Sequence, residues 1–146
     1  MADTKRILLI EDNDIVRRYY AERLRKLLCD CVILEAVTGQ TGLDLFQWQT
    51  IDCVILDLSL PDMSGFEVLA KLVPVAAEPA VAVIILTSFD HHSLLEAAQH
   101  KGAFSALQKD LTSADELATH VRRAMTQVTP VEKRAIAAPP RLSVSA

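Results

Sequence analysis

The sequence predicts an α/β fold in which five parallel strands alternate with five helices. Short apolar runs without polar alternation, such as the run over 80–86, are typical of strands that are covered on both faces. The segments between these runs carry apolar residues at helical spacing. The chain has 146 residues, of which 51% are hydrophobic, so it is long enough to form one domain with a substantial core.

The elements can be placed in order along the chain. The first strand is expected over 6–10 and ends in the polar cluster 11–14, which contains good helix-capping residues. In the helix that follows, Val16, Tyr20, Leu24 and Leu27 recur at helical spacing, with Arg17 and other arginines between them. The other expected strands cover 31–36, 54–56, 80–86 and 104–108, and the other expected helices cover 39–48, 66–72, 90–101 and 113–125.

The carboxyl-terminal residues differ in character from the rest. Residues 1–126 carry the alternating pattern and are predicted to form the domain. Residues 127–146 contain Pro130, Pro139 and Pro140 and few core-forming positions, so they are predicted to be a flexible tail or the remnant of a linker. Composition does not distinguish these two alternatives.

Charge and composition exclude several classes of protein. The net charge of −4 and the absence of a basic cluster argue against direct nucleic-acid binding. The chain has no apolar stretch long enough to insert into a membrane and no signal-peptide pattern at its start, so a cytoplasmic protein is expected. Cys29, Cys31 and Cys53 do not form a zinc pattern and are expected to be reduced thiols in or near the core.

Polar residues follow four of the predicted strands. In a parallel sheet with right-handed crossovers the carboxyl ends of all strands lie at one edge, where ligands bind. That edge collects Glu11 and Asp12, Asp57, Thr87 and Lys109. Three crowded carboxylates favour a hard divalent cation such as Mg²⁺. With a cation nearby, Asp57 can attack a phosphoryl group whose oxygens Lys109 and Thr87 contact.

Each of these residues also has a simpler explanation. Asp57 taken alone is more easily explained as the acid that ends a strand before the turn at Pro61. The four histidines, His91, His92, His100 and His120, form no convincing ligand set and are expected to be solvated helix residues. No Gly-rich loop follows the first strand, which argues against a nucleotide-binding protein.

Taken together, the motif resembles the receiver domains of bacterial two-component response regulators. The resemblance covers about residues 5–125. It rests on the acid pair Glu11-Asp12, on Asp57 with Pro61 and Gly65 beyond it, on Thr87-Ser88, and on Gly102-Ala103 leading to Lys109. It implies a flavodoxin-like (CheY-like), doubly wound sheet with strand order 2-1-3-4-5.

The resemblance also implies a function. Asp57 would be the phosphoacceptor, phosphorylated from a sensor histidine kinase or a histidine phosphotransfer protein. Asp12, Asp57 and the Ser59 backbone carbonyl would coordinate Mg²⁺, with Glu11 acting through water, while Thr87 and Lys109 contact the phosphoryl group. Such a protein is not an enzyme beyond self-catalysed phosphorylation and dephosphorylation. Its output would pass through the surface formed by the fourth helix (90–101), the fifth strand (104–108) and the fifth helix (113–125) to a downstream protein or to a homodimer.

Two residues depart from the family pattern. Asp110 follows Lys109 where the family usually has proline, and Ala106 stands where the family usually has the aromatic residue that reports phosphorylation. Phe104 is the nearest aromatic side chain, and strand alternation places it on the same face as Ala106 but in a different pocket. The residues of the expected phosphorylation site therefore match the family, whereas the position that would report phosphorylation to the surface does not.

Two other functions remain open. The departures at Ala106 and Asp110 are compatible with a pseudo-receiver, an interaction module that works without phosphorylation. An aspartyl-phosphate phosphatase of the haloacid-dehalogenase type shares the acid nucleophile but expects a second acid two residues later, where this chain has Ser59.

Overall fold

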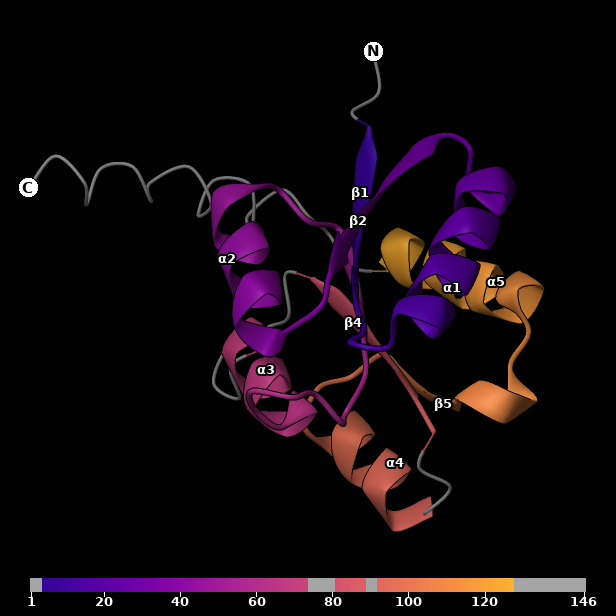
Figure 1. Ribbon diagram of the computed structural model, residues 1–146. Coiled ribbons are helices and arrows are strands. Elements are labelled where there is room, and N and C mark those ends of the chain that lie inside the picture. The colour runs from indigo at the N-terminus through magenta and orange to yellow at the C-terminus, as the bar shows by residue number, and fades with distance from the viewer. Residues whose placement is uncertain (1–3, 74–80, 89–91, 128–146) are drawn as a thin grey trace, which may run out of the picture.

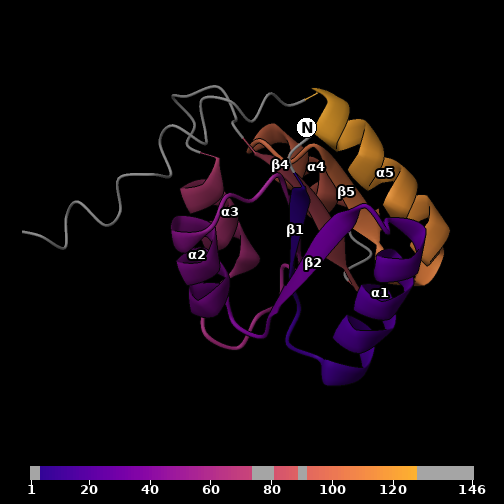
Figure 2. The ribbon, with the colours of Figure 1, turned by 90° about the horizontal axis from the view of Figure 1, so that it is seen from above.

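The protein is a three-layered α/β/α sandwich around one parallel sheet (Figure 1). The computed structural model describes residues 4–73, 81–88 and 92–127. Five strands lie in the order β2-β1-β3-β4-β5, and all four neighbouring pairs are parallel. Viewed from above, α1 and α5 cover one face of the sheet, and α2 and α3 lie on the other (Figure 2). The predicted fold class and strand order are thus confirmed.

The described elements alternate as the sequence predicts. The strands are β1 (Lys5–Ile10), β2 (Cys31–Ala36), β3 (Cys53–Leu56), β4 (Ala82–Thr87) and β5 (Ser105–Gln108). The helices are α1 (Asp14–Leu27), α2 (Gly39–Trp48), α3 (Gly65–Leu72), α4 (His92–His100) and α5 (Ala114–Gln127), with a short 3-10 turn η1 (Lys109–Leu111) before α5.

Most bounds agree with the prediction, and the differences lie at element ends. β2 and α2 have the predicted residues. β4 begins at Ala82 and includes Thr87, while β5 begins one residue later than expected, at Ser105. The predicted starts at Ala80 and Asp90 lie outside the described residues.

The buried face of α1 differs from the predicted one. The sequence pattern placed Leu27 toward the core and Arg17 between the core positions, but Leu27 is 38% exposed and Arg17 only 7%. The side chains that face the core are Arg17, Tyr20, Ala21 and Leu24, which are spaced i, i+3, i+4 and i+7. This spacing follows one face of a helix with 3.6 residues per turn, so an arginine occupies a core position.

The core lies on both faces of the sheet because alternate strand residues point in opposite directions. Ile55 and Ile84 pack with α1 and α5, whereas Val54 and Ile85 pack against the opposite layer. All residues of β3 and β4 are buried, as predicted for runs without polar alternation. None of the helices in the described part of the chain has the length and hydrophobicity needed to span a lipid bilayer.

The aromatic side chain near β5 does not lie where the sequence predicted. Phe104 packs with the cluster between the sheet and α1 and α5, whereas Ala106 packs with the cluster on the opposite face. Phe104 precedes the first residue of β5, so strand alternation does not determine its direction. The expectation that Phe104 shares a face with Ala106 was therefore wrong.

Candidate functional site at the carboxyl edge of the sheet

Asp57 is the buried acid at the end of β3. Its backbone N–H donates to the Ile10 carbonyl at 3.2 Å, which extends the pairing of β1 and β3 by one residue. The residue is 4% exposed. One carboxylate oxygen accepts a hydrogen bond from the Ser59 N–H at 3.2 Å, and the other accepts one from the Lys109 ammonium at 3.1 Å.

The acid pair after β1 lies beside Asp57. Glu11 is 3% exposed, and its carboxylate accepts hydrogen bonds from the Lys109 ammonium at 2.5 Å and from the Asn13 N–H at 3.0 Å. Asp12 is exposed at the rim. Glu11, Asp12 and Asp57 each offer a carboxylate oxygen within 4.8 Å of the others. The structure thus brings together the three acids predicted from the ends of two strands.

Lys109 compensates the charge of the two buried acids. Burial raises the pKa of the Glu11 carboxyl, while the hydrogen bond from Lys109 opposes this shift. Burial by itself would lower the pKa of Lys109, but its hydrogen bonds and charge interactions with Glu11 and Asp57 outweigh burial and raise that pKa. The lysine therefore remains a cation at neutral pH.

The acids fit a magnesium ion. Mg²⁺ binds oxygen ligands at about 2.0–2.1 Å in an octahedron, which places the ligand oxygens roughly 3–4 Å apart. The separations of up to 4.8 Å between the oxygens of Glu11, Asp12 and Asp57 need only small side-chain movements to reach that spacing. The exposed Asp12 leaves one side of the cluster open to water, which Mg²⁺ usually retains among its ligands.

Thr87 lies at the same edge of the sheet. It is the last residue of β4, is fully buried, and pairs in register with Gln108, the residue before Lys109. β4 also borders β3, where Leu56 pairs with Ile85. The sheet thus places Thr87 next to both strands that carry the acid and the lysine, as the sequence predicted.

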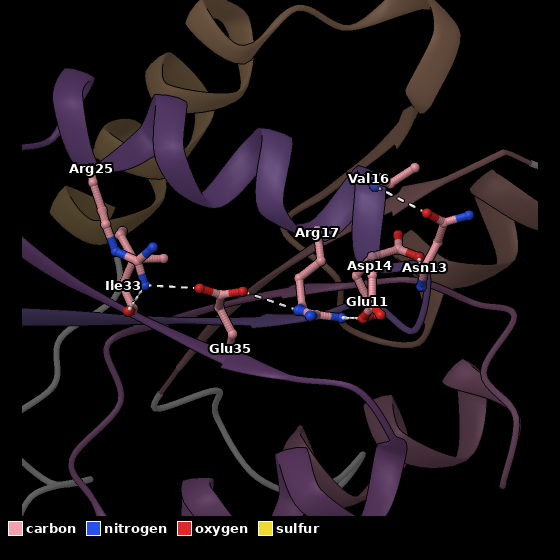
Figure 3. A network of polar contacts seen from close by, with 8 residues as sticks. All are labelled: Glu11, Asn13, Asp14, Val16, Arg17, Arg25, Ile33 and Glu35. Carbon is pink, nitrogen blue, oxygen red and sulfur yellow. Dashed lines mark hydrogen bonds and ion pairs between the residues drawn. The ribbon is translucent and has the colours of Figure 1, made fainter.

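Arg17 holds the loop that carries the acid pair (Figure 3). Its guanidinium donates to the Glu11 backbone carbonyl at 3.2 Å and pairs with Asp14 at 2.8 Å and with Glu35 at 3.0 Å. Glu35 on β2 also accepts a hydrogen bond from Arg25 at 3.0 Å. A buried cation needs such partners, and here they connect α1, β2 and the loop after β1.

Tyr20 contacts the loop on the other side of the site. It is 6% exposed, and its hydroxyl lies 3.4 Å from the Lys109 carbonyl and 3.2 Å from the Thr112 carbonyl. The first carbonyl belongs to the opening residue of the η1 turn and the second to the residue after it, so the hydroxyl contacts both ends of η1. A side chain from α1 thus contacts the loop whose first residue is Lys109.

The loop between β3 and α3 returns close to Asp57. The Gly65 N–H donates to the Leu58 carbonyl at 2.9 Å, and Ser59 and Ser64 form an antiparallel bridge. A Cβ atom at Gly65 would lie 2.5 Å from the Asp57 carbonyl oxygen and 2.5 Å from Leu58 Cα. Only glycine therefore allows α3 to begin this close to the end of β3.

The histidines and cysteines take no part in this site. His92 and His100 are exposed on α4, whereas His120 on α5 is half-buried and lies 3.1 Å from the Ser105 hydroxyl. Cys53 is buried as predicted, but Cys29 is exposed and so does not belong to the core. Within residues 4–73, 81–88 and 92–127, the acids Glu11, Asp12 and Asp57 are the one group of three or more His, Cys, Asp or Glu side chains that lie close enough together to hold a metal ion. His91 lies outside the described residues.

Sequence reasoning missed two side chains beside the site. Arg17 could have been found, because it continues the i, i+3, i+4 and i+7 pattern of α1 as its one charged member. Asp62 accepts hydrogen bonds from the first N–H groups of α2, and no local pattern in the loop after β3 indicates that contact. The first omission reflects the choice of helix face, and the second a contact between distant segments.

The fold and this arrangement of side chains define a domain with an acidic, lysine-bridged pocket at the carboxyl edge of a 2-1-3-4-5 sheet. Residues 7–122 match the response regulator receiver domain family, and the chain belongs to this family. Receiver domains of this family bind Mg²⁺ in an acidic pocket, and the acid cluster of this chain corresponds to such a pocket.

Curated relatives include regulators that are longer than this chain. The transcriptional regulatory protein PdtaR of Mycobacterium tuberculosis (strain H37Rv) is 31% identical over 127 residues, which cover 84% of this chain and 60% of PdtaR. The transcriptional regulatory protein LnrK of Bacillus subtilis (strain 168) is 33% identical over 138 residues, which cover 94% of this chain and 58% of LnrK. The chain thus spans less than two thirds of either relative.

Solved structures share the fold over nearly their whole length. The receiver domain of the Francisella response regulator 1452 has a TM-score of 0.75 at 20% identity, covering 85% of this chain and 98% of that one. The receiver domain of a putative Luxo repressor protein from Vibrio parahaemolyticus has a TM-score of 0.73 at 28% identity, covering 86% of this chain and 95% of that one. Such domains therefore have the size of the described part of this chain.

Proposed function

We propose that this chain is a cytoplasmic phosphorylation switch in which Asp57 accepts a phosphoryl group from a sensor histidine kinase or a histidine phosphotransfer protein. The observation that carries the proposal is the position of Asp57, a 4%-exposed carboxylate bonded to the Lys109 ammonium and grouped with Glu11 and Asp12. A nucleophilic carboxylate with a fixed cation beside it is the arrangement that phosphoryl transfer requires.

The transfer itself is a displacement at phosphorus. A carboxylate oxygen of Asp57 forms the new P–O bond while the P–N bond to the donor imidazole breaks, and the imidazole nitrogen takes up a proton. Lys109 neutralises charge on the transferred oxygens, and the Thr87 hydroxyl donates to one of them. When bound, Mg²⁺ supplies further charge neutralisation at these oxygens. Asp12, Asp57 and the Ser59 carbonyl would hold the ion, with Glu11 bonded through water.

A groove beside Lys109 supports docking of the phosphoryl donor there. It has a volume of about 360 Å³ and is lined by Ile15, Val16, Tyr19, Tyr20, Lys109 and Asp110. Ile15 is 82% exposed, and Leu111 on the adjoining η1 turn is 72% exposed. Large apolar side chains this exposed and this close to a reactive group favour a protein partner. A donor seated there approaches Asp57 from the side of Lys109.

The first test is intact mass after incubation with acetyl phosphate and Mg²⁺. We expect one phosphoryl adduct on the parent chain and none on Asp57→Asn, which keeps the shape of the side chain but lacks the nucleophilic charge. Asp44→Asn on α2, an exposed acid, is the matched control and should be phosphorylated like the parent. An adduct on Asp57→Asn, or none on the parent with either acetyl phosphate or a phosphorylated donor protein, would contradict the proposal.

The output is proposed to pass through α4, β5 and α5 to a downstream protein or to a second copy of the chain. Size-exclusion chromatography of the phosphorylated and unphosphorylated chain distinguishes these two. Ala106 is too small to swing between two positions as an aromatic ring does, which favours a second candidate, an interaction module that works without phosphorylation. Equal affinity of a partner protein for the phosphorylated parent, the unphosphorylated parent and Asp57→Asn would support that candidate.

A further inference from the structure

The tip of the loop between β3 and α3 is attached to the start of α2. The two carboxylate oxygens of Asp62 accept hydrogen bonds from the backbone N–H groups of Gly39 and Gln40, both at 2.9 Å. N–H groups in the first turn of a helix have no partner within the helix, and a carboxylate there is also stabilised by the helix dipole. These two hydrogen bonds lower the pKa of Asp62, so the side chain is charged at neutral pH.

A second contact reinforces this attachment. The side chain of Met63 packs against Gly39, where an added Cβ atom would lie 2.6 Å from Met63 Cγ. Met63 also packs with the core cluster on this face of the sheet. Two consecutive residues at the tip of the loop thus contact the same turn of α2, one through charged hydrogen bonds and one through packing.

The base of the same loop contacts Asp57. The Ser59 N–H donates to the Asp57 carboxylate at 3.2 Å, and Ser59 bridges to Ser64 across the loop. Because the Gly65 N–H is also bonded to the Leu58 carbonyl at 2.9 Å, the loop is a closed unit from the acid to the start of α3. The tip that contacts α2 and the base that contacts Asp57 are therefore parts of one hydrogen-bonded loop.

We infer that Asp62 is a positioning residue that holds Ser59 against Asp57 by anchoring the loop on α2. This inference rests on the proposed function, in which the Ser59 carbonyl is a ligand of Mg²⁺. Asp62 touches neither Asp57 nor the other acids, so it acts on the site through the loop alone. Without the Asp62 carboxylate the tip of the loop is released from α2. The Ser59 backbone then samples positions in which its carbonyl cannot coordinate Mg²⁺.

The test compares Asp62→Ala with the parent by isothermal titration with Mg²⁺. Removing a group that is hydrogen-bonded directly to a metal ligand typically weakens metal binding by about 10–100-fold. Because Asp62 acts on Ser59 through the loop, we expect a loss of affinity below that range, of a few-fold. Asp62→Asn keeps one oxygen acceptor and should show a smaller loss. The rate of adduct formation from acetyl phosphate at low Mg²⁺ should fall in the same order.

Thr38→Ala is the matched control. The Thr38 hydroxyl accepts a hydrogen bond from the Thr41 N–H at 3.0 Å and thus caps the same helix through a bond within α2 rather than one to the loop. This variant should lower the melting temperature in the way Asp62→Ala does but leave the Mg²⁺ dissociation constant unchanged. If Thr38→Ala weakens Mg²⁺ binding as much as Asp62→Ala, helix stability explains the effect and the inference is wrong.

Amide hydrogen exchange separates this inference from the proposed function. We expect the Ser59 and Gly65 amides to exchange faster in Asp62→Ala than in the parent or in Thr38→Ala, with or without Mg²⁺. If the parent is never phosphorylated but this exchange pattern is found, the anchoring role stands and only the proposed function fails. Unchanged exchange at both amides in Asp62→Ala overturns the inference, whatever the phosphorylation result.

Discussion

Lys109 is the residue on which the charge balance of the site depends. Its ammonium lies 2.5 Å from a Glu11 oxygen and 3.1 Å from an Asp57 oxygen, and the three side chains are 16%, 4% and 5% exposed. Two carboxylates this close and this buried repel each other unless a cation lies between them. A single cation therefore offsets the repulsion between the two buried acids in the absence of a metal.

Replacing Lys109 by methionine should destabilise the protein. Removing one partner from a buried set of charges costs about 3–5 kcal/mol, because the remaining charges have no compensation. We expect a loss near 3 kcal/mol in the free energy of unfolding, measured by urea denaturation at pH 7 without Mg²⁺. Lys101→Met, at an exposed position after α4, should change it by less than about 0.5 kcal/mol. Equal stabilities of the two variants would show that Lys109 does not compensate the acids.

At the scale of elements, contacts between them position the side chains of the site. Arg17 connects α1 to β2 and to the loop after β1, and Tyr20 connects α1 to the turn after β5. At the start of β5, Ser105 lies 3.1 Å from His120 of α5. The contact between Ser105 and His120 joins β5 and α5, which are two of the three elements of the proposed output surface. It includes a titratable side chain, His120.

His120 should make the stability of the α5–β5 contact depend on pH. Burial, followed by the nearby charge of Arg123, lowers the pKa of His120 below 6.5, whereas Glu116 acts in the opposite direction. Between pH 6.5 and the lower pKa of the folded state, the unfolded chain binds more protons than the folded one. The free energy of unfolding therefore falls as the pH is lowered through this range.

The measurement is urea denaturation between pH 7.5 and about 5. His120→Gln should show a weaker decrease in the free energy of unfolding than the parent over this range. His100→Gln, at an exposed position on α4, is the control and should follow the parent. If His120→Gln and the parent lose stability in parallel, the contact with Ser105 is not pH-sensitive.

At the scale of the whole molecule, one sheet with helices on both faces supports the site. The family match covers 7–122, and α5 continues to Gln127. The division into a domain over 1–126 and a tail over 127–146 stays a prediction. The buried face of α5 includes Ala124, which is fully buried, so the helix belongs to the core almost to its end.

Shortening the chain tests where the domain ends. A chain ending at Gln127 should have the melting temperature of the full chain and form the phosphoryl adduct at the same rate, because it keeps every strand and helix from β1 to α5. A chain ending at Val121 loses Ala124 and almost the last two turns of α5, and should lose more than about 1 kcal/mol of stability. A lower melting temperature for the chain ending at Gln127 would show that the tail contributes to the fold.

The sequence determined by itself the order of elements, the parallel sheet and the acids, threonine and lysine at its edge. These features depend on short-range patterns and on one rule of topology, which brings the ends of parallel strands together. Glu11, Asp57 and Lys109 could therefore be named before their distances were known.

The tertiary structure decided between the helix faces that the sequence pattern allowed, and it alone decided which distant segments hold the site in place. It placed Arg17 rather than Leu27 in the core, turned Phe104 away from Ala106, and joined Asp62 to the start of α2. The physical reason is that these contacts join residues from different elements, at separations set by how the helices pack on the sheet. Local periodicity carries no information about such separations.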